Sequence, residues 1–215
     1  MKNVINLILC AIPFAIAIYF YPQFPHTIPT HYNLYGEADG FGSKNMIFLE
    51  AALPLIFWVL YVLIPKIDPK SKLVLMGGKY QYFSTGTIAI ITALSTFMIL
   101  SALNQKFTIN IVAFNLILAV FFLLMGNYMS ALKPNYFIGI RTPSTLESEY
   151  VWKKTHVLGG KLFFAIGVLL ILFACIKTLQ PYSTHILIGS IIGITITTGI
   201  YSYWLFKKEK KEMLK

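Results

Sequence analysis

Six long apolar runs constrain this chain of 215 residues more than any other feature. A helix that spans a bilayer needs about 20 predominantly apolar residues, because lipid offers no hydrogen-bond partner to an exposed backbone. The runs cover approximately residues 4–21, 46–64, 85–103, 109–131, 158–179 and 183–206. Only 12% of the residues are charged, which is unusually few for a soluble domain. We therefore predict an all-α polytopic membrane protein with six transmembrane helices, built as one integral domain over residues 1–215.

The positive charges predict the orientation, because Lys and Arg are retained on the cytoplasmic side. With both termini in the cytoplasm, 15 of the 18 basic residues lie inside, and only Lys44, Lys106 and Lys177 lie outside. Topology and attraction to anionic inner-leaflet lipid then explain the net charge of +10. The basic loop at 65–84 is expected to be solvated beside the headgroups. Direct nucleic-acid binding is not expected, since no soluble basic stretch is interleaved with aromatic residues.

The segment 22–45 is predicted to be an ordered extracellular loop, because its prolines restrict the backbone and its glycines permit turns. Asp39-Gly40 is a favourable turn pair. His26, His31 and Asp39 are metal-ligand types, so a metal-dependent membrane enzyme is one alternative. Their spacing does not present them to one ion, as two histidines one helical turn apart would. We expect no metal, no cofactor and no enzymatic activity.

The segment 132–157 is a polar, turn-rich island between two apolar runs, and we call it the signature loop. Ser144 followed by Glu147 fits a capping box. This pattern predicts a short interfacial helix that starts near Thr145 and leads into the fifth span. Trp152 has an amphipathic ring suited to headgroup depth.

Polar and small residues also occur inside the apolar runs. Four of them support a small transporter or channel as an alternative function, because buried polar groups are costly in lipid: Glu50, Asn115, Asn127 and Lys161. Glu50 and Lys161 lie about one turn inside their runs, where an interfacial position is the simpler interpretation. Gly189 and Gly193 form a GxxxG pattern in the last run, which predicts close helix contact.

The signature loop resembles a known family. Residues 135–143, NYFIGIRTP, together with Ser148-Glu149, Val151-Trp152, Lys154-Thr155-His156 and Gly159-Gly160, are similar to the signature of the SdpI family. The outer loop resembles the small amino-terminal domain of unknown function found in that family, on the following residues: Pro29, His31, Asn33, Gly36, Asp39-Gly40, Gly42 and Lys44.

This resemblance implies an immunity protein of the bacterial plasma membrane that gives resistance to a secreted, membrane-active peptide toxin. It also implies a possible second role, in which the protein signals toxin by holding a small transcriptional autorepressor at the membrane. We expect the toxin to contact the outer loop through His31, Asn33, Asp39 and Lys44. A cytoplasmic partner is expected to contact Arg141, Glu149, Trp152 and His156.

Overall fold

A computed structural model describes residues 2–70, 72–103 and 108–214 of the chain. Two basic residues used in the charge argument, Lys106 and Lys215, lie outside this range. Within it, six helices are long and apolar enough to cross a membrane, which confirms the predicted number. They are α1 (Lys2–Phe20), α2 (Ile47–Ile67), α3 (Gly78–Ser101), α4 (Ile111–Met129), α6 (Glu149–Cys175) and α7 (Ser183–Met213).

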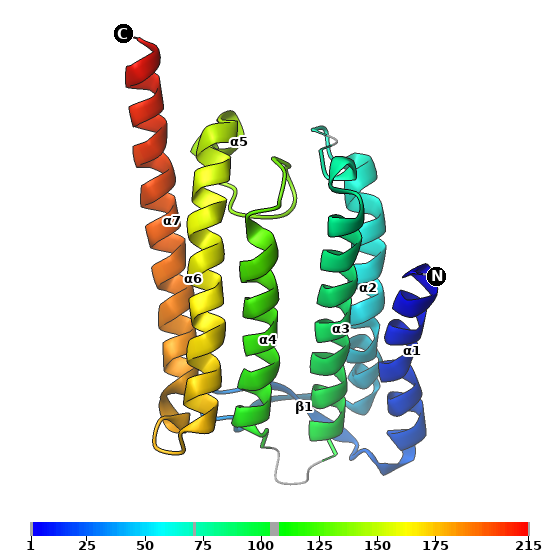
Figure 1. Cartoon of the computed structure of the whole chain (residues 1–215). Coiled ribbons are helices and arrows are strands. Elements are labelled where there is room, and N and C mark those ends of the chain that lie inside the picture. Colours follow the sequence, from blue (N-terminus) through cyan, green and yellow to red (C-terminus); the bar gives the residue numbers. More distant parts are fainter. Residues whose placement is uncertain (1, 71, 104–107, 215) are drawn as a thin grey trace.

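Two of these helices begin well before the apolar runs that predicted them. The run at 85–103 belongs to α3, which starts at Gly78, and the run at 158–179 belongs to α6, which starts at Glu149. The early turns carry polar residues, which interrupt a hydropathy pattern but leave the backbone hydrogen bonds of a helix intact. Both helices therefore extend past the apolar segment toward the same end of the bundle (Figure 1).

The six helices form two groups that stand next to each other (Figure 1). One group contains α1, α2 and α3, and the other contains α4, α6 and α7, with α6 between its two neighbours. Aromatic pairs join the groups where α3 meets α4. The rings of Phe83 and Tyr128 are 5.8 Å apart, and those of Phe97 and Phe114 are 6.3 Å apart.

Glycines allow α4 and α6 to pack very closely. A Cβ atom on Gly126 would lie 2.6 Å from the backbone nitrogen of Phe164, and one on Gly160 would lie 2.8 Å from the Gly126 carbonyl oxygen. The GxxxG pattern of α7 does not behave as expected. In the part of the chain that the structure describes, no atom outside the neighbouring backbone of α7 lies within 4 Å of a Cβ placed on Gly189 or Gly193, so these glycines mediate no close helix contact there.

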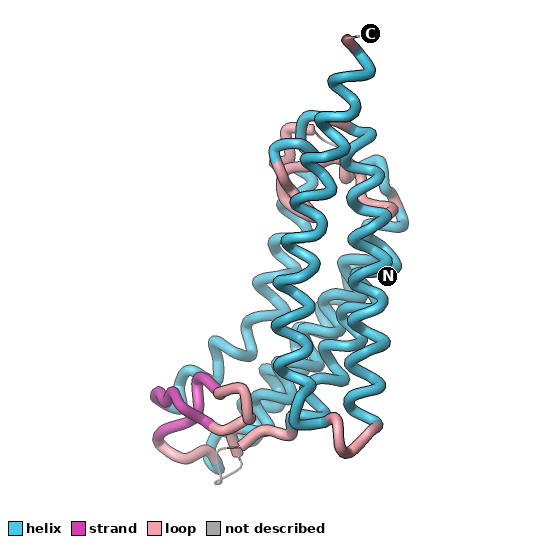
Figure 2. Tube along the Cα trace, turned by 90° about the vertical axis from the view of Figure 1, so that its left-hand side faces the viewer, coloured by secondary structure: helices cyan, strands magenta, loops and turns pink. Residues whose placement is uncertain are grey.

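A β-hairpin lies across one end of the bundle, which we call the hairpin end (Figures 1 and 2). It consists of β1 (Thr27–Tyr32) and β2 (Ala38–Ser43), paired antiparallel, and adds a small sheet to a fold that is otherwise helical. Ile28 is buried in one cluster with residues of α1, α2 and α3. Packing against the helices therefore stabilises a strand that its own composition, interrupted by Pro29, does not predict.

The turn of the hairpin is not at Asp39-Gly40, as the sequence indicates, but at Asn33–Glu37, where Gly36 has a φ angle of 79°. Asp39 and Gly40 belong to β2. Gly40 is paired with His31, and a Cβ atom on it would lie 2.9 Å from the His31 Cβ. The glycine is thus required for close strand pairing.

The hairpin reaches from the first helix group to the second. The Ile109 amide donates a hydrogen bond of 2.9 Å to the Gly36 carbonyl oxygen, just before α4 begins. The Tyr35 ring lies 6.3 Å from the ring of His185 in the first turn of α7. Both contacts hold the tip of the hairpin beneath the second group.

The opposite end of the bundle, the signature end, is formed by the signature loop, the 68–77 connection and the carboxy-terminal turns of α7 (Figure 2). A cluster of buried side chains joins the 68–77 connection to the signature loop across the two helix groups: Leu73, Met76, Tyr80, Met129, Leu132 and Trp152. The short helix α5 (Pro143–Glu147) precedes α6, so the predicted helix before the fifth span exists.

Candidate functional site

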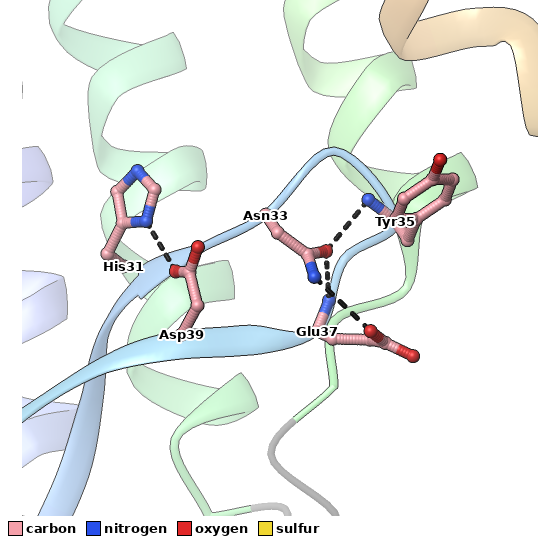
Figure 3. A network of polar contacts seen from close by, with 5 residues as sticks. All are labelled: His31, Asn33, Tyr35, Glu37 and Asp39. Atoms are coloured by element: carbon pink, nitrogen blue, oxygen red, sulfur yellow. Dashed lines mark hydrogen bonds and ion pairs between the residues drawn. The ribbon is translucent and has the colours of Figure 1, made fainter.

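On the hairpin, His31 and Asp39 form an exposed ion pair across the two strands (Figure 3). The distance between His31 Nδ1 and Asp39 Oδ1 is 2.5 Å, and the two side chains are 72% and 46% exposed. Because such a pair is solvated, it contributes little to the stability of the fold. Its polar atoms are therefore accessible to a partner that approaches this end.

Asn33 organises the tip of the hairpin (Figure 3). Its side-chain oxygen accepts hydrogen bonds from the backbone amides of Tyr35 (2.9 Å) and Glu37 (3.1 Å), and its side-chain nitrogen donates to a Glu37 carboxylate oxygen at 3.2 Å. An asparagine that satisfies turn amides in this way fixes the backbone locally. Asn33 therefore shapes the surface, while His31 and Asp39 present free polar atoms.

Lys44 does not join the other hairpin candidates. Its ammonium group lies 4.5 Å from the centre of the Tyr21 ring, at the α1 side of the hairpin. His26 is also remote from His31, because five residues of extended strand span about 16 Å. Among the described residues, no three His, Cys, Asp or Glu side chains gather closely enough to hold a metal ion.

At the signature end, Asn135 holds the first turn of the signature loop. Its buried side-chain oxygen accepts from the amides of Phe137 (2.8 Å) and Ile138 (2.7 Å), and its nitrogen donates to the carbonyl oxygens of Lys133 and Ile138. All of its hydrogen-bonding capacity is used inside the loop. Asn135 begins the NYFIGIRTP signature, and the ability of asparagine to bond nearby backbone amides is the signal for this turn.

Trp152 and His156 form the buried centre of the loop. The Trp152 indole N–H donates to the Leu132 carbonyl oxygen at 2.8 Å, and its ring stacks on His156 with 4.0 Å between centroids. The Ile140 amide donates to His156 Nε2 at 3.0 Å, while His156 Nδ1 lies 2.8 Å from the Trp152 carbonyl oxygen. Because a carbonyl can only accept, Nδ1 carries the proton and the imidazole is neutral.

This burial corrects two expectations about the signature loop. Trp152 is 2% exposed and His156 is 0% exposed, so neither side chain contacts headgroups or lies at a surface that a partner can reach. Trp152 was expected to meet the headgroups, and both residues were expected to contact a partner, whereas the loop folds over them and satisfies their polar atoms. Their role in this structure is to hold the loop on α6.

The other two cytoplasmic candidates are accessible. Glu149 lies in the first turn of α6 and forms an ion pair with Lys72, which lies in the 68–77 connection between α2 and α3. Arg141 is exposed, and its guanidinium group donates to the Tyr136 carbonyl oxygen. Both side chains remain available at the surface of the signature end.

The short helix α5 is capped two residues earlier than the Ser144 and Glu147 pattern indicates. Thr142 is the N-cap, and its hydroxyl accepts from the Thr145 amide at 3.2 Å, while the Thr145 hydroxyl accepts from the Thr142 amide at 2.9 Å. Ser144 lies inside the helix and is buried. The Thr142 hydroxyl also lies 2.9 Å from the Ser202 hydroxyl of α7, which attaches the loop to the last helix.

The 68–77 connection is bound to the signature loop. The sequence predicted only that this basic loop would be solvated beside the headgroups. The buried Asp68 carboxylate accepts from the Tyr136 amide at 3.2 Å, and Lys70 Nζ donates to the Leu146 carbonyl oxygen at 2.7 Å. The sequence contains no local pattern for these contacts, because their partners are about seventy positions apart.

The four polar residues of the transporter alternative do not converge. Glu50 lines a cavity beside Thr30 of the hairpin, and the Asn115 side chain donates to the Ser183 hydroxyl at 2.7 Å. Asn127 and Lys161 share a different cavity near the signature end. The hydrogen bond of Asn115 links α4 to the start of α7.

These features define a polytopic membrane protein whose exposed polar chemistry is concentrated at its two ends. Residues 131–202 match the model of the SdpI/YfhL protein family, and residues 8–57 match a domain of unknown function, DUF1648. Residues 131–202 therefore form a segment of the SdpI/YfhL type, and the chain is a multi-pass protein of the bacterial plasma membrane.

Similarity to a curated protein extends along nearly the whole chain. The chain is 25% identical over 208 residues to Immunity protein SdpI of Bacillus subtilis (strain 168). The aligned residues cover 96% of this chain and 97% of that protein. The alignment thus includes both the hairpin and the signature loop. No solved structure matches the chain significantly.

Proposed function

We propose that this protein is an immunity protein that protects a bacterium against a secreted, membrane-active peptide toxin. The similarity to Immunity protein SdpI along both chains carries the proposal. The concentration of accessible polar groups at the two ends supports it further, because a protein that meets an extracellular peptide needs an ordered surface there. A non-enzymatic role follows from this proposal.

The hairpin end is proposed to face outward and the signature end to face the cytoplasm. The distribution of positive charge supports this orientation, because Lys and Arg are retained on the cytoplasmic side. The basic residues near the signature end include those that follow Phe206 in α7 and also Lys66, Lys70, Lys72 and Lys79. Only Lys44 and Lys177 of the described basic residues lie at the hairpin end.

The toxin is proposed to bind the hairpin. The exposed His31–Asp39 pair provides polar contacts beside apolar side chains that are also exposed, Leu34 (42%) and Phe41 (51%). A surface that has both polar and apolar groups suits an amphipathic, membrane-active peptide. In this proposal Asn33 maintains the shape of the tip, and Lys44 contributes at the edge of the surface, near Tyr21.

A signalling role requires the toxin to prefer one of two conformations, because a ligand with equal affinity for both shifts no equilibrium. The hairpin contacts both helix groups, so its displacement would alter how the groups meet. At the other end, the Lys72–Glu149 ion pair joins the same groups. A small transcriptional repressor at the cytoplasmic face would then contact Glu149 and Arg141, both of which are exposed.

The test is survival of a toxin-sensitive bacterium that expresses the chain, measured against a panel of membrane-active peptides that includes the sporulation-delaying toxin. Asp39→Ala is expected to lose protection, because it removes the carboxylate that holds His31. The matched control is Glu212→Ala, which removes an exposed acid near the far end of α7. Immunoblots of isolated membranes ensure equal abundance.

Selective protection that Asp39→Ala loses and Glu212→Ala retains would support both immunity and the hairpin as the toxin contact. Full protection by Asp39→Ala at equal abundance would reject the hairpin assignment alone. An absence of protection by the unaltered chain against every peptide would contradict the proposed function.

A further inference from the structure

Two adjoining cavities occupy the signature end, and neither has a role in the proposed immunity function. The first has a volume of about 430 Å³ and is lined by residues of α3, the turn after α4, and α6. The second has a volume of about 480 Å³ and follows the crossing of α4 and α6. Ser130 lines both of them, so the two cavities adjoin at this residue.

The first cavity carries an uncompensated positive charge. Lys79, Lys133 and Lys153 line it, all three are exposed, and no ion pair involving them occurs among the described residues. Glu149 also lines the cavity, but it is already paired with Lys72. Three lysines held around one hollow repel one another unless an anion binds between them.

The position of one of these lysines strengthens the argument for an anion. Lys79 lies in the first turn of α3, which has no side-chain cap and no acidic residue in that turn. The amino-terminal end of a helix has a partial positive charge, so a lysine there is unfavourable in the absence of a negative ligand. The start of α3 and the lysines therefore attract the same kind of group.

The surroundings of this charge are apolar. Leu75 lines the same cavity and is 76% exposed, and its neighbour Val74 is 62% exposed. Large apolar side chains with such exposure are unusual in water but are expected at the boundary between headgroups and acyl chains. The lysines thus lie beside exposed apolar side chains of the kind that suits this boundary.

The second cavity leads away from the lysines along the helices. Its apolar walls include Val157 and Phe164, and its floor is the glycine crossing of Gly126 and Gly160. Phe164 follows Lys153 by about 16 Å along the axis of α6, at 1.5 Å per residue. This groove therefore extends from headgroup depth into the hydrocarbon region. Lys161 lies on its wall and can direct its ammonium group back toward the headgroups.

We infer that these two cavities bind an anionic phospholipid. Its phosphate lies among Lys79, Lys133 and Lys153, and one acyl chain lies in the groove along Val157 and Phe164. Basic pockets between transmembrane helices are suited to anionic headgroups. An acidic soluble peptide would leave the apolar groove empty, and a free phosphate ion would fill only a small part of the combined volume.

The experiment is native mass spectrometry of the purified full chain, incubated in detergent with dioleoyl phosphatidylglycerol or, separately, dioleoyl phosphatidylcholine. The pocket variant is Lys133→Gln with Lys153→Gln. Its matched control is Lys210→Gln with Lys211→Gln, which removes the same charge from the exposed end of α7. Each pocket lysine is expected to contribute about fivefold to affinity, so the double variant should weaken phosphatidylglycerol binding roughly 30-fold.

A second variant, Val157→Trp, fills the groove and leaves every lysine in place. It is expected to reduce lipid binding, whereas soluble glycerophosphoglycerol, which has the headgroup without acyl chains, should not compete measurably. Equal losses in the pocket and control double variants would overturn the site. Undiminished binding by Val157→Trp, or effective competition by the soluble headgroup, would show a site for a soluble anion and overturn the lipid assignment.

Discussion

At the scale of single residues, Gly139 and His156 illustrate how tightly the signature loop is packed. Gly139 has a φ angle of 115°, and a Cβ atom there would collide with His156 Nε2. That nitrogen accepts the hydrogen bond from the Ile140 amide. One residue therefore provides both the backbone conformation and the space that its buried partner requires.

Gly139→Ala is predicted to destabilise the protein by about 1–3 kcal/mol, because it strains the backbone and displaces His156. Thermal unfolding in detergent, followed by intrinsic tryptophan fluorescence, measures the change. Gly199→Ala is the control, since no atom lies within 4 Å of a Cβ on this helical glycine. It should be neutral or slightly stabilising. An unchanged midpoint for Gly139→Ala would disprove the packing argument.

Individual side chains also show why some exposed candidate residues could be predicted from the sequence and why the burial of others could not. His31, Asp39, Arg141 and Glu149 have ionisable side chains in polar segments, and the structure leaves them exposed. Trp152 and His156 look equally polar in the sequence, yet both are buried. Their partners are the Leu132 carbonyl and the Ile140 amide, and backbone groups carry no residue-specific signal.

At the scale of elements, the helices follow from composition but their closest contact does not. Apolar runs of sufficient length predict all six spans, because the bilayer permits few other structures. The GxxxG pattern of α7 predicted a close helix contact, whereas Gly126 and Gly160, which belong to different helices, provide one. A pattern search within one helix cannot detect a contact shared between two.

Gly160→Leu is predicted to destabilise the bundle by about 1–3 kcal/mol or more, since a side chain would have to separate α4 from α6. Gly193→Leu makes the same chemical change where no atom lies within 4 Å, and is expected to change stability by only about 0.5 kcal/mol. Unfolding midpoints of the two variants in the same detergent test this difference. Equal destabilisation would mean that the α4–α6 contact is not the critical one.

The hairpin is the element that local sequence described least well. Its ordered character was expected, but its strands and the position of its turn were not. Asp39-Gly40 is a strong turn pair in isolation. The burial of Ile28 against α1, α2 and α3 instead selects the pairing that places the turn at Asn33–Glu37. Packing against the bundle therefore overrides the local preference.

At the scale of the whole molecule, both ends connect the two helix groups. The hairpin contacts residues beside α4 and α7 at one end, and Lys72 and Asp68 bind the signature loop at the other. The proposed orientation assigns these ends to opposite sides of the membrane. Communication between them would then require relative movement of the groups at the α3–α4 contact.

Cysteine labelling of intact cells tests the orientation. In a background that lacks Cys10 and Cys175, Thr178→Cys at the hairpin end should react with a membrane-impermeant maleimide, because Thr178 is exposed between α6 and α7. Glu147→Cys, exposed at the signature end, should react only after the membrane is permeabilised. The reverse pattern would invert the topology and, with it, the assignment of the toxin-facing surface.

The sequence by itself determined the membrane class, the six spans, the charge asymmetry and the family signature. These properties depend on composition and on motifs within short segments, so they can be read along the chain. Only the tertiary structure decided that Trp152 and His156 are buried, that Gly126 and Gly160 form the close crossing, and that the hairpin joins both helix groups. Burial and pairing depend on which distant residues become neighbours, and local patterns do not contain that information.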